Sequence, residues 1–428
     1  MKNAIQKLGL ALKDPALRKR ILFTLILLVI FRALATIPIP GVDAARLTSF
    51  FSQNQFFGLL NIFSGGGLST LSIVMLGVGP YITASIIMQL LTLMSPRLKA
   101  MYQEEGAIGR KKFTQYSRLI TVPLALIQSF AFLTLLQNQG VVVPLTFFEL
   151  VVNILVITTG SVFLMWLGEL MTEFGIGNGL SIIIFAGIVA SLPTAVNQFV
   201  FKYIYPEFDP SILPMAIGIL IAGFLVILGV VIITEAERAI PVTYAKRVRG
   251  MKMYGGVSTY LPLRLNQSGV IPIIFALSIL LFPQMIFNFL AQVNNATIKA
   301  ISTFVTGILA NGWFYAALYF VLVFAFTYFY TAVTFDPKAL STNLQKNGAF
   351  IPGVRPGQST AIHISRILTR LTFVGALFLG IIAVLPIIVR AITGDATFAI
   401  GGTALLIVVS VVLDLFKKID AQISMKEY

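Results

Sequence analysis

The chain has 428 residues, 57% of them hydrophobic and 11% charged, and a formal net charge of +15. Soluble domains average about 25% charged residues, so too few polar side chains are present here to cover a water-soluble surface. The composition therefore excludes an ordinary soluble protein and predicts a surface covered largely by lipid. The positive charge would suggest a nucleic-acid partner in a soluble protein, but it is expected in loops that flank membrane helices.

Ten apolar runs are each long enough to cross a membrane, because a helix needs about 20 apolar residues to span the hydrocarbon core. The runs are continuous rather than alternating, which favours helices over a β-barrel. We therefore predict an all-α polytopic membrane protein with ten transmembrane helices. The runs cover about residues 21–38, 74–94, 117–137, 148–168, 180–200, 212–233, 270–290, 313–333, 368–389 and 398–416.

The first twenty residues are basic and carry apolar residues near helical spacing, which predicts an amphipathic N-terminus at the cytoplasmic surface. The run that follows is a full span rather than a short h-region, so we expect no cleaved signal peptide. Residues 56–72 (FFGLLNIFSGGGLSTLS) are too apolar for a plain outer loop and too interrupted to span. A re-entrant element packed within the protein and an amphipathic helix on the outer surface fit this segment equally well.

Basic residues alternate between the connections. Of the 31 Lys and Arg residues, 26 lie at the chain ends or in every second connection, four lie in the other connections, and Arg32 lies inside a run. Basic residues close to membrane helices are held on the cytoplasmic side. The pattern therefore predicts that both termini are cytoplasmic.

Two of the predicted cytoplasmic loops, residues 234–269 and 334–367, are longer than 30 residues and contain turn-forming Gly and Pro clusters. Structureless loops beyond about 15 residues are uncommon unless functional, so we expect ordered, hairpin-like protrusions rather than loose connectors. The spans divide into an N-terminal half (21–205) and a C-terminal half (206–416), followed by a cytoplasmic tail (417–428). Five spans per half would give the halves opposite orientations, as in inverted repeats.

Titratable groups at membrane depth, which an enzyme or a proton-coupled carrier would need, are scarce. Besides Arg32, the chain places Glu149, Glu169 and Asp414 near the ends of runs, and its single histidine, His363, in a basic loop. The chain has no cysteine, and the motifs HExxH, GxSxG and GxxxxGK(S/T) do not occur. We therefore predict no catalytic residue, no cofactor and no metal.

Two functions remain open at this point: a passive gated channel and an ion-coupled secondary transporter of small solutes. Helices interrupted by Gly and Pro and the possible inverted repeat suit a transporter, which is also the commoner class, whereas the scarcity of ionisable groups suits a channel. Val78 and Ile82 share a helix face, as do Leu180 and Ile184. Such pairs occur in any membrane helix, so lipid or core packing explains them equally well.

Nine short sequences, in order along the chain, carry a resemblance to a known family that extends from about residue 20 to residue 416. They are IPIPG (37–41), NIFSGG (61–66), GPYITASIIMQLL (79–91), MWLGE (165–169), GIGNG (175–179), IIIFAGIVA (182–190), YAKR (244–247), GVIPIIFA (269–276) and GAFIPGVRPG (348–357). Together they resemble the SecY family, the central subunits of the bacterial protein-conducting channel. The resemblance implies two inverted five-helix halves around a central hourglass pore in the bacterial cytoplasmic membrane, and it favours the channel over the transporter.

The resemblance also implies a constriction and a plug. A ring of aliphatic side chains resists water and ions by dewetting and offers a passing polypeptide no hydrogen bonds. The ring residues implied are Val78, Ile82, Leu180, Ile184, Ile274 and Ile407. The plug residues implied are Asn61, Phe63, Ser64, Gly65, Gly66, Gly67, Leu68 and Leu71.

The family opens sideways, between its second and third spans and its seventh and eighth, so that a signal peptide or a new membrane helix reaches the lipid bilayer. Polar residues expected at this lateral gate are Gln89, Thr92, Gln128 and Ser278. Contacts between polar side chains of membrane helices average only about 0.6 kcal/mol, so a seam with few of them could open. Ordinary interhelical packing explains each of these residues about equally well.

The two long loops match the docking sites of the family for the ATPase SecA and for the ribosome. The docking residues implied are Arg355, Arg238, Lys246, Arg247, Arg249 and Lys252. Arg355 in GVRPG ranks first, because the sequence EAERAIPV around Arg238 departs from relatives with a denser Arg cluster. The positive field of these residues would steer an acidic protein surface or rRNA phosphates. SecE and SecG are further implied partners, and energy must come from a partner because no ATP site is apparent.

Overall fold

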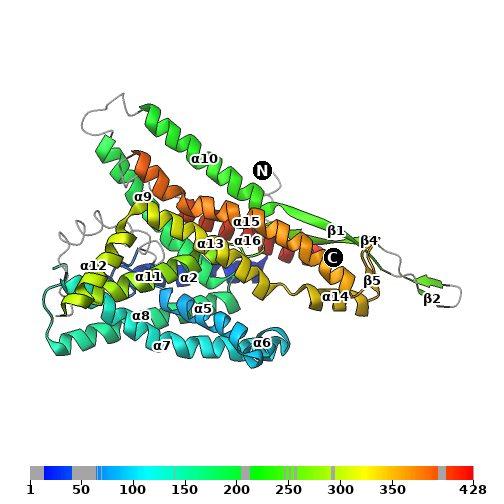
Figure 1. Cartoon of the computed structure of the whole chain (residues 1–428), viewed down its shortest axis with the longest axis horizontal. Coiled ribbons are helices and arrows are strands. Elements are labelled where there is room, and N and C mark those ends of the chain that lie inside the picture. The colour runs from blue at the N-terminus through cyan, green and yellow to red at the C-terminus, as the bar shows by residue number, and fades with distance from the viewer. Residues whose placement is uncertain are drawn as a thin grey trace.

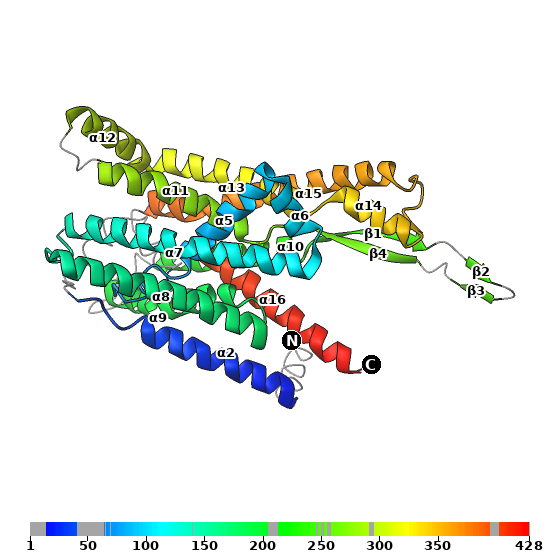
Figure 2. The same cartoon turned by 90° about the horizontal axis from the view of Figure 1, so that it is seen from below.

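The computed structural model describes residues 14–40, 64, 66–68, 70–138, 140–203, 213–244, 247–249, 252–254, 258–290, 295–393 and 402–427. Helices dominate this part of the chain (Figures 1 and 2). Each of the ten predicted runs falls on a helix. These helices are α2 (Pro15–Leu34), α5 (Gly79–Met94), α7 (Gly106–Asn138), α8 (Phe147–Phe174), α9 (Gly179–Tyr203), α10 (Leu213–Glu235), α11 (Ile271–Leu290), α13 (Gly312–Thr334), α15 (Gln358–Thr393) and α16 (Gly402–Glu427).

Within the described residues, four stretches are long and apolar enough by themselves to cross a membrane. They are Gly106–Gln137, Phe147–Phe174, Gly312–Lys346 and Gln358–Val389. The chain is therefore a multi-pass helical protein. Crossing by all ten helices stays a prediction. Three further helices connect these elements: α6 (Pro96–Gln103), α12 (Ala296–Ala310) and α14 (Pro337–Lys346).

One acidic residue at the end of an apolar run belongs to a helix cap at the start of α8. Thr146 precedes α8, and its side chain accepts a hydrogen bond from the Glu149 N–H, while the Glu149 carboxylate accepts one from the Thr146 N–H at 2.8 Å. This reciprocal pair is a capping box, which satisfies two backbone donors that the first turn leaves free. Glu149 is thereby accounted for as a helix cap.

The two halves of the chain meet along two seams. Helix α11 of the C-terminal half contacts α5 and α7, and α16 contacts α9. A hydrophobic cluster lies within the C-terminal half, where α13 packs against α15 and α11. In Figure 2, α11 and α13 lie above α7, and α8, α9 and α2 lie below it.

The first long loop is a β-hairpin, as expected. Strand β1 (Glu237–Tyr244) pairs antiparallel with β4 (Ser258–Arg264), and a second pair, β2 (Arg247–Arg249) and β3 (Lys252–Tyr254), lies further along the protrusion (Figure 1). The alternation of exposed and buried side chains along β1 is typical of a strand with one face covered.

The prediction of a hairpin in the second long loop is wrong. This loop forms α14 and a two-residue strand, β5 (Ala349–Phe350), which pairs with the free edge of β1. Asp336 caps α14 through its carboxylate, which accepts the Lys338 N–H at 2.8 Å, and Pro337 follows as the first helical residue. Asp-Pro is a strong helix-start signal, and the turn residues further along the loop form turns between β5 and α15 rather than the tip of a hairpin.

Candidate functional site

The six aliphatic residues of the predicted ring lie in one hydrophobic cluster. They come from four helices: Val78 caps α5 and Ile82 follows in it, Leu180 and Ile184 lie on α9, Ile274 lies on α11 and Ile407 lies on α16. Val78, Ile184 and Ile407 are buried, and the other three are partly buried against them. Residues separated by more than 300 positions in the sequence thus share one apolar centre.

The loop before α9 sets the position of Leu180. Asn178 accepts hydrogen bonds through Oδ1 from the N–H groups of Leu180 (3.1 Å) and Ser181 (3.4 Å), so it acts as a helix cap. A Cβ atom on Gly179 would overlap the carbonyl oxygen of Gly168, so the close crossing of α9 on α8 requires glycine here. The Leu180 side chain also packs against Gly168, so α8 helps to fix the position of this predicted ring residue.

All six ring side chains are aliphatic and offer no ligand atom to an ion. Among the described residues, no group of three or more His, Cys, Asp or Glu side chains could hold a metal ion. Aliphatic side chains cannot replace the hydration shell of an ion, so water and ions are disfavoured in such a constriction. The arrangement suits a seal that binds nothing tightly.

The described part of the predicted plug is packed inside the protein. Ser64, Leu68 and Leu71 are buried, and both leucines share a cluster with Ile39 and with residues of α7 and α8. This burial favours a re-entrant segment over a helix on the outer surface. Gly66 has a positive φ of 83°, which only glycine adopts readily. Asn61, Phe63 and Gly65 lie outside the described residues.

Polar contacts tie this segment to the end of α2. The Thr70 hydroxyl donates to the Ala35 carbonyl at 2.8 Å, and the Leu71 carbonyl accepts the Ile39 N–H at 2.9 Å. The exposed Arg32 lies on the same side, with its guanidinium 3.4 Å from where a Cβ of Gly66 would stand. The single charge within the first run therefore lies beside the plug segment.

The four predicted gate residues lie on α5, α7 and α11, which meet at one seam. Their hydrogen bonds in the described structure stay within their own helices. Thr92 donates to the Gln89 carbonyl at 2.6 Å, Ser278 donates to the Ile274 carbonyl at 2.9 Å, and the Gln89 amide donates to Ser85 at 3.4 Å.

The expected polar contacts across the seam are therefore not made by these four side chains. Ser and Thr in helices readily bond a carbonyl one turn back, which satisfies the hydroxyl without a partner helix. Gln128 is half-buried on α7, and the Gln89 Oε1 atom is buried without a hydrogen-bond partner. The seam between the halves thus depends mainly on apolar packing.

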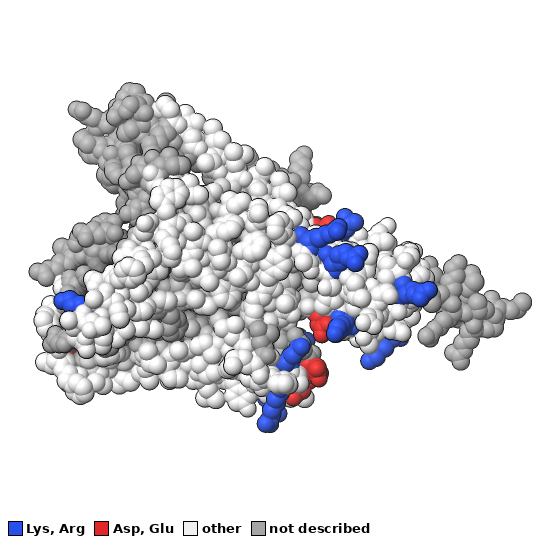
Figure 3. All heavy atoms as spheres, in the orientation of Figure 1, with Lys and Arg blue, Asp and Glu red and all other residues white. Residues whose placement is uncertain are grey.

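The two long loops form one structural unit. Ile240, Val242 and Leu263 of the hairpin share a hydrophobic cluster with Ile351 of the second loop and with Ile364 at the start of α15. Arg355 and Arg238 are both exposed on this unit. Figure 3 shows Lys and Arg side chains gathered toward the end of the molecule that carries the strands, with little blue at the far end of this face.

The remaining predicted docking residues are described less fully. Arg247 lies on β2 together with Arg249, and Lys252 lies on β3, so their backbones belong to the outer strand pair. Lys246 lies outside the described residues. Arg238 and Arg355 belong to the same platform, because β1 pairs with β5, but Arg238 lies at the opposite end of β1 from that pairing.

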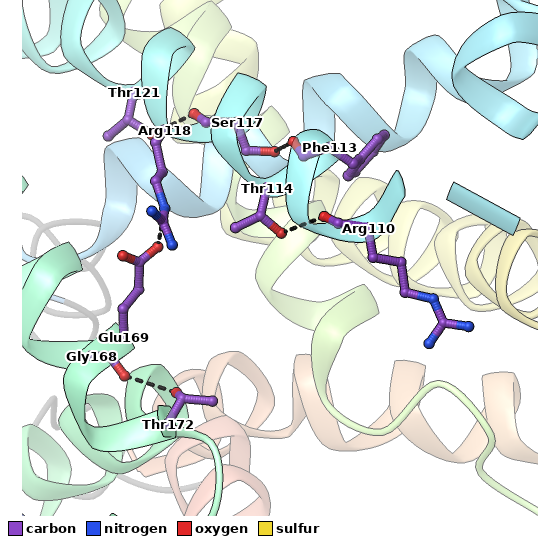
Figure 4. Close-up of polar contacts among 9 residues, drawn as sticks. All are labelled: Arg110, Phe113, Thr114, Ser117, Arg118, Thr121, Gly168, Glu169 and Thr172. Carbon is purple, nitrogen blue, oxygen red and sulfur yellow. Dashed lines mark hydrogen bonds and ion pairs between the residues drawn. The ribbon is translucent and has the colours of Figure 1, made fainter. Parts of the chain in front are cut away.

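One charged contact was not predicted. Arg118 of α7 forms an ion pair with Glu169 of α8, with 2.5 Å between Nε and Oε1 (Figure 4). Neighbouring hydroxyls of the same helices bond carbonyls of their own helix, as Thr172 does with Gly168. The signal was present in the sequence, because one charge lies near the start of a predicted span and the other at the end of the next one. Consecutive spans are antiparallel neighbours, so their facing ends meet.

The fold and the site define a multi-pass helical membrane protein whose two parts meet around an aliphatic centre. Comparison with protein families matches residues 72–416 to the SecY family. A curated relative, protein translocase subunit SecY of Corynebacterium glutamicum, is 41% identical over 446 residues, with 98% of each chain covered. The chain belongs to the SecY family.

Solved structures share this fold at lower identity. One describes a SecY plug domain that stabilises the closed state of the translocation channel and maintains a membrane seal; it is 20% identical, with a TM-score of 0.64 over 95% of this chain and 92% of that one. Another is Sec61 in the canine ribosome-channel complex from the endoplasmic reticulum. It is 18% identical, with a TM-score of 0.61 over the same shares of the two chains.

Proposed function

We propose that this chain is the pore-forming subunit of a gated protein-conducting channel. It moves unfolded secretory polypeptides across the bacterial cytoplasmic membrane and releases membrane helices sideways into lipid. The observation that carries the proposal is the convergence of six aliphatic side chains from α5, α9, α11 and α16 in one cluster. An aliphatic constriction closes to ions by dewetting and lets any polypeptide sequence slide through.

The two halves would move apart at the seam between α11 and the pair α5 and α7. Ten membrane crossings, with both termini cytoplasmic, place the strand-bearing end in the cytoplasm and the plug segment on the outer side. The seam opens when the apolar helix of a signal peptide or of a nascent membrane protein replaces the apolar contacts between the halves. The buried, unpartnered Gln89 Oε1 gives that incoming helix a hydrogen-bond acceptor.

The cytoplasmic platform is the proposed docking site for the machine that feeds the pore. Exposed Arg355 and Arg238 present positive charge on a rigid unit, which suits an acidic protein surface or rRNA phosphates. SecA and the ribosome are the proposed partners there, and the ribosome-bound Sec61 relative supports the second of them. SecE and SecG complete the proposed complex within the bilayer.

The alternative of an ion-coupled transporter of small solutes has no support. Such a transporter needs a midplane site with ionisable or cation-binding groups, and the described centre of this protein is aliphatic. The translocase relative, which covers 98% of the chain, also belongs to the channel class.

Ion conductance tests the constriction. Replacing Ile82 or Ile184 with serine should raise the resting conductance of the channel complex in planar bilayers severalfold, because a hydroxyl lets water wet the ring. Ile273 is a matched control, since it neighbours the ring residue Ile274 and is buried, but packs in the separate cluster of the C-terminal half. Ile273→Ser should reduce stability without added conductance. Conductance equal to that of the parent in both ring variants would remove the ring assignment.

A further inference from the structure

The link between the plug segment and the first ring residue is held from two sides. On one side, the Ile73 N–H donates to the Ile37 carbonyl at 3.0 Å, next to the bond between Ile39 and Leu71. On the other side, the Ser161 hydroxyl of α8 donates to the Gly77 carbonyl at 2.9 Å, in a fully buried contact. The acceptor residue directly precedes Val78, the buried cap of α5.

The residue before Ser161 lets α8 approach this closely. A Cβ atom on Gly160 would overlap the carbonyl oxygen of Ile73, so the helix touches the backbone of the link at a position where no side chain fits. Gly77 itself has a positive φ of 58°, and its carbonyl lies outside the ladder of α5. A buried carbonyl needs a hydrogen-bond partner, and Ser161 supplies it across 84 residues of sequence.

We propose that Gly160 and Ser161 anchor the link to α8, so that displacement of the plug leaves Val78 and the start of α5 in place. They are positioning residues, and the inference rests on the proposed pore function. Leu71 marks the other end of the anchored stretch. It is buried and has a φ of 43°, the one positive value among described non-glycine residues. The movable part of the plug therefore ends at this residue, and the ring keeps its shape while the plug moves.

Replacing Ser161 with alanine tests the anchor, because it leaves the Gly77 carbonyl buried without its donor. We expect the resting conductance of the channel complex to rise about fivefold, the scale set by the loss of one buried hydrogen bond. The chain has no cysteine, so a Val78→Cys variant can be labelled specifically. Its reaction with a membrane-impermeant maleimide should be slow with Ser161 and severalfold faster with Ser161→Ala, because Val78 is then no longer fixed.

Ser117→Ala is the matched control. Ser117 is also buried, and its hydroxyl bonds only the Phe113 carbonyl of its own helix. The anchor predicts no change in conductance or labelling for this variant. Ser161→Ala values equal to the parent's would overturn the anchor, and so would equal rises in both variants, which indicate general loosening.

The outcome for Ile82→Ser separates the anchor from the pore itself. If Ile82→Ser raises the resting conductance above that of the parent and Ser161→Ala does not, only the anchor proposal is wrong. If neither conducts more than the parent, the constriction assignment fails as well. Gly160→Ala gives a second variant on the anchor, expected to raise conductance by pushing the Ile73 carbonyl away from α8.

Discussion

The docking role proposed for Arg355 depends on the charge of one exposed side chain. Its backbone carbonyl accepts a hydrogen bond from the Thr360 hydroxyl at 2.8 Å, so the turn is fixed while the guanidinium faces solvent. Arg355→Glu should therefore cripple SecA-driven export and leave the protein folded and inserted. Lys299→Glu is the matched charge reversal on α12, far from the platform, and should export normally. Normal export by Arg355→Glu would remove the docking assignment.

Residue identity alone could not assign the pore ring. Val78 and Ile82, or Leu180 and Ile184, are spaced like packing residues of any membrane helix. Only tertiary structure brings these pairs together with Ile407, and local spacing carries no information about such contacts. The hydrogen bond of Ser161 could not be predicted either, because its acceptor is a backbone carbonyl, which every residue has.

Among the elements, the platform joins two loops through a small hydrophobic cluster of its own. Ile364 at the start of α15 is fully buried there, whereas Ile362 is 54% exposed. Ile364→Ala should destabilise the platform by about 2–4 kcal/mol, the usual cost of emptying a buried aliphatic site. Hydrogen exchange of β1 and β5 amides should then accelerate together. Ile362→Ala should leave exchange unchanged, and separate responses of the two strands would contradict a joint unit.

Helices were predictable because long apolar runs have few alternatives in lipid. The β1–β4 hairpin was predictable from loop length and turn residues. The structure of the second loop was not, because β5 has two residues and forms only when the edge of β1 is present. The apolar character of the gate seam was missed for a similar reason: polar residues such as Thr92 and Ser278 bond their own helices.

The whole molecule has a strong charge asymmetry. On the face shown in Figure 3, basic side chains gather toward the strand-bearing end, and most of the remaining described surface is uncharged. Membrane orientation alone requires basic loops on the cytoplasmic side. The added feature is that two long loops fold into one platform at that end, where a partner could push a polypeptide toward the aliphatic centre. Under the proposed function, the docking platform at one end and the seal in the middle would belong to one path through the protein.

Crosslinking along that path tests the central claim most directly. A photo-reactive side chain would be placed at Ile82, Ile184 or Ile274, and a secretory polypeptide would be stalled during translocation. Controls are Ile273, which is buried in the separate cluster of the C-terminal half, and Phe224 on α10, which is 65% exposed. If the polypeptide passes through the ring, we expect adducts at the three ring positions and none at the two controls. Adducts missing from the ring, or equally strong at Phe224, would contradict a pore through this centre.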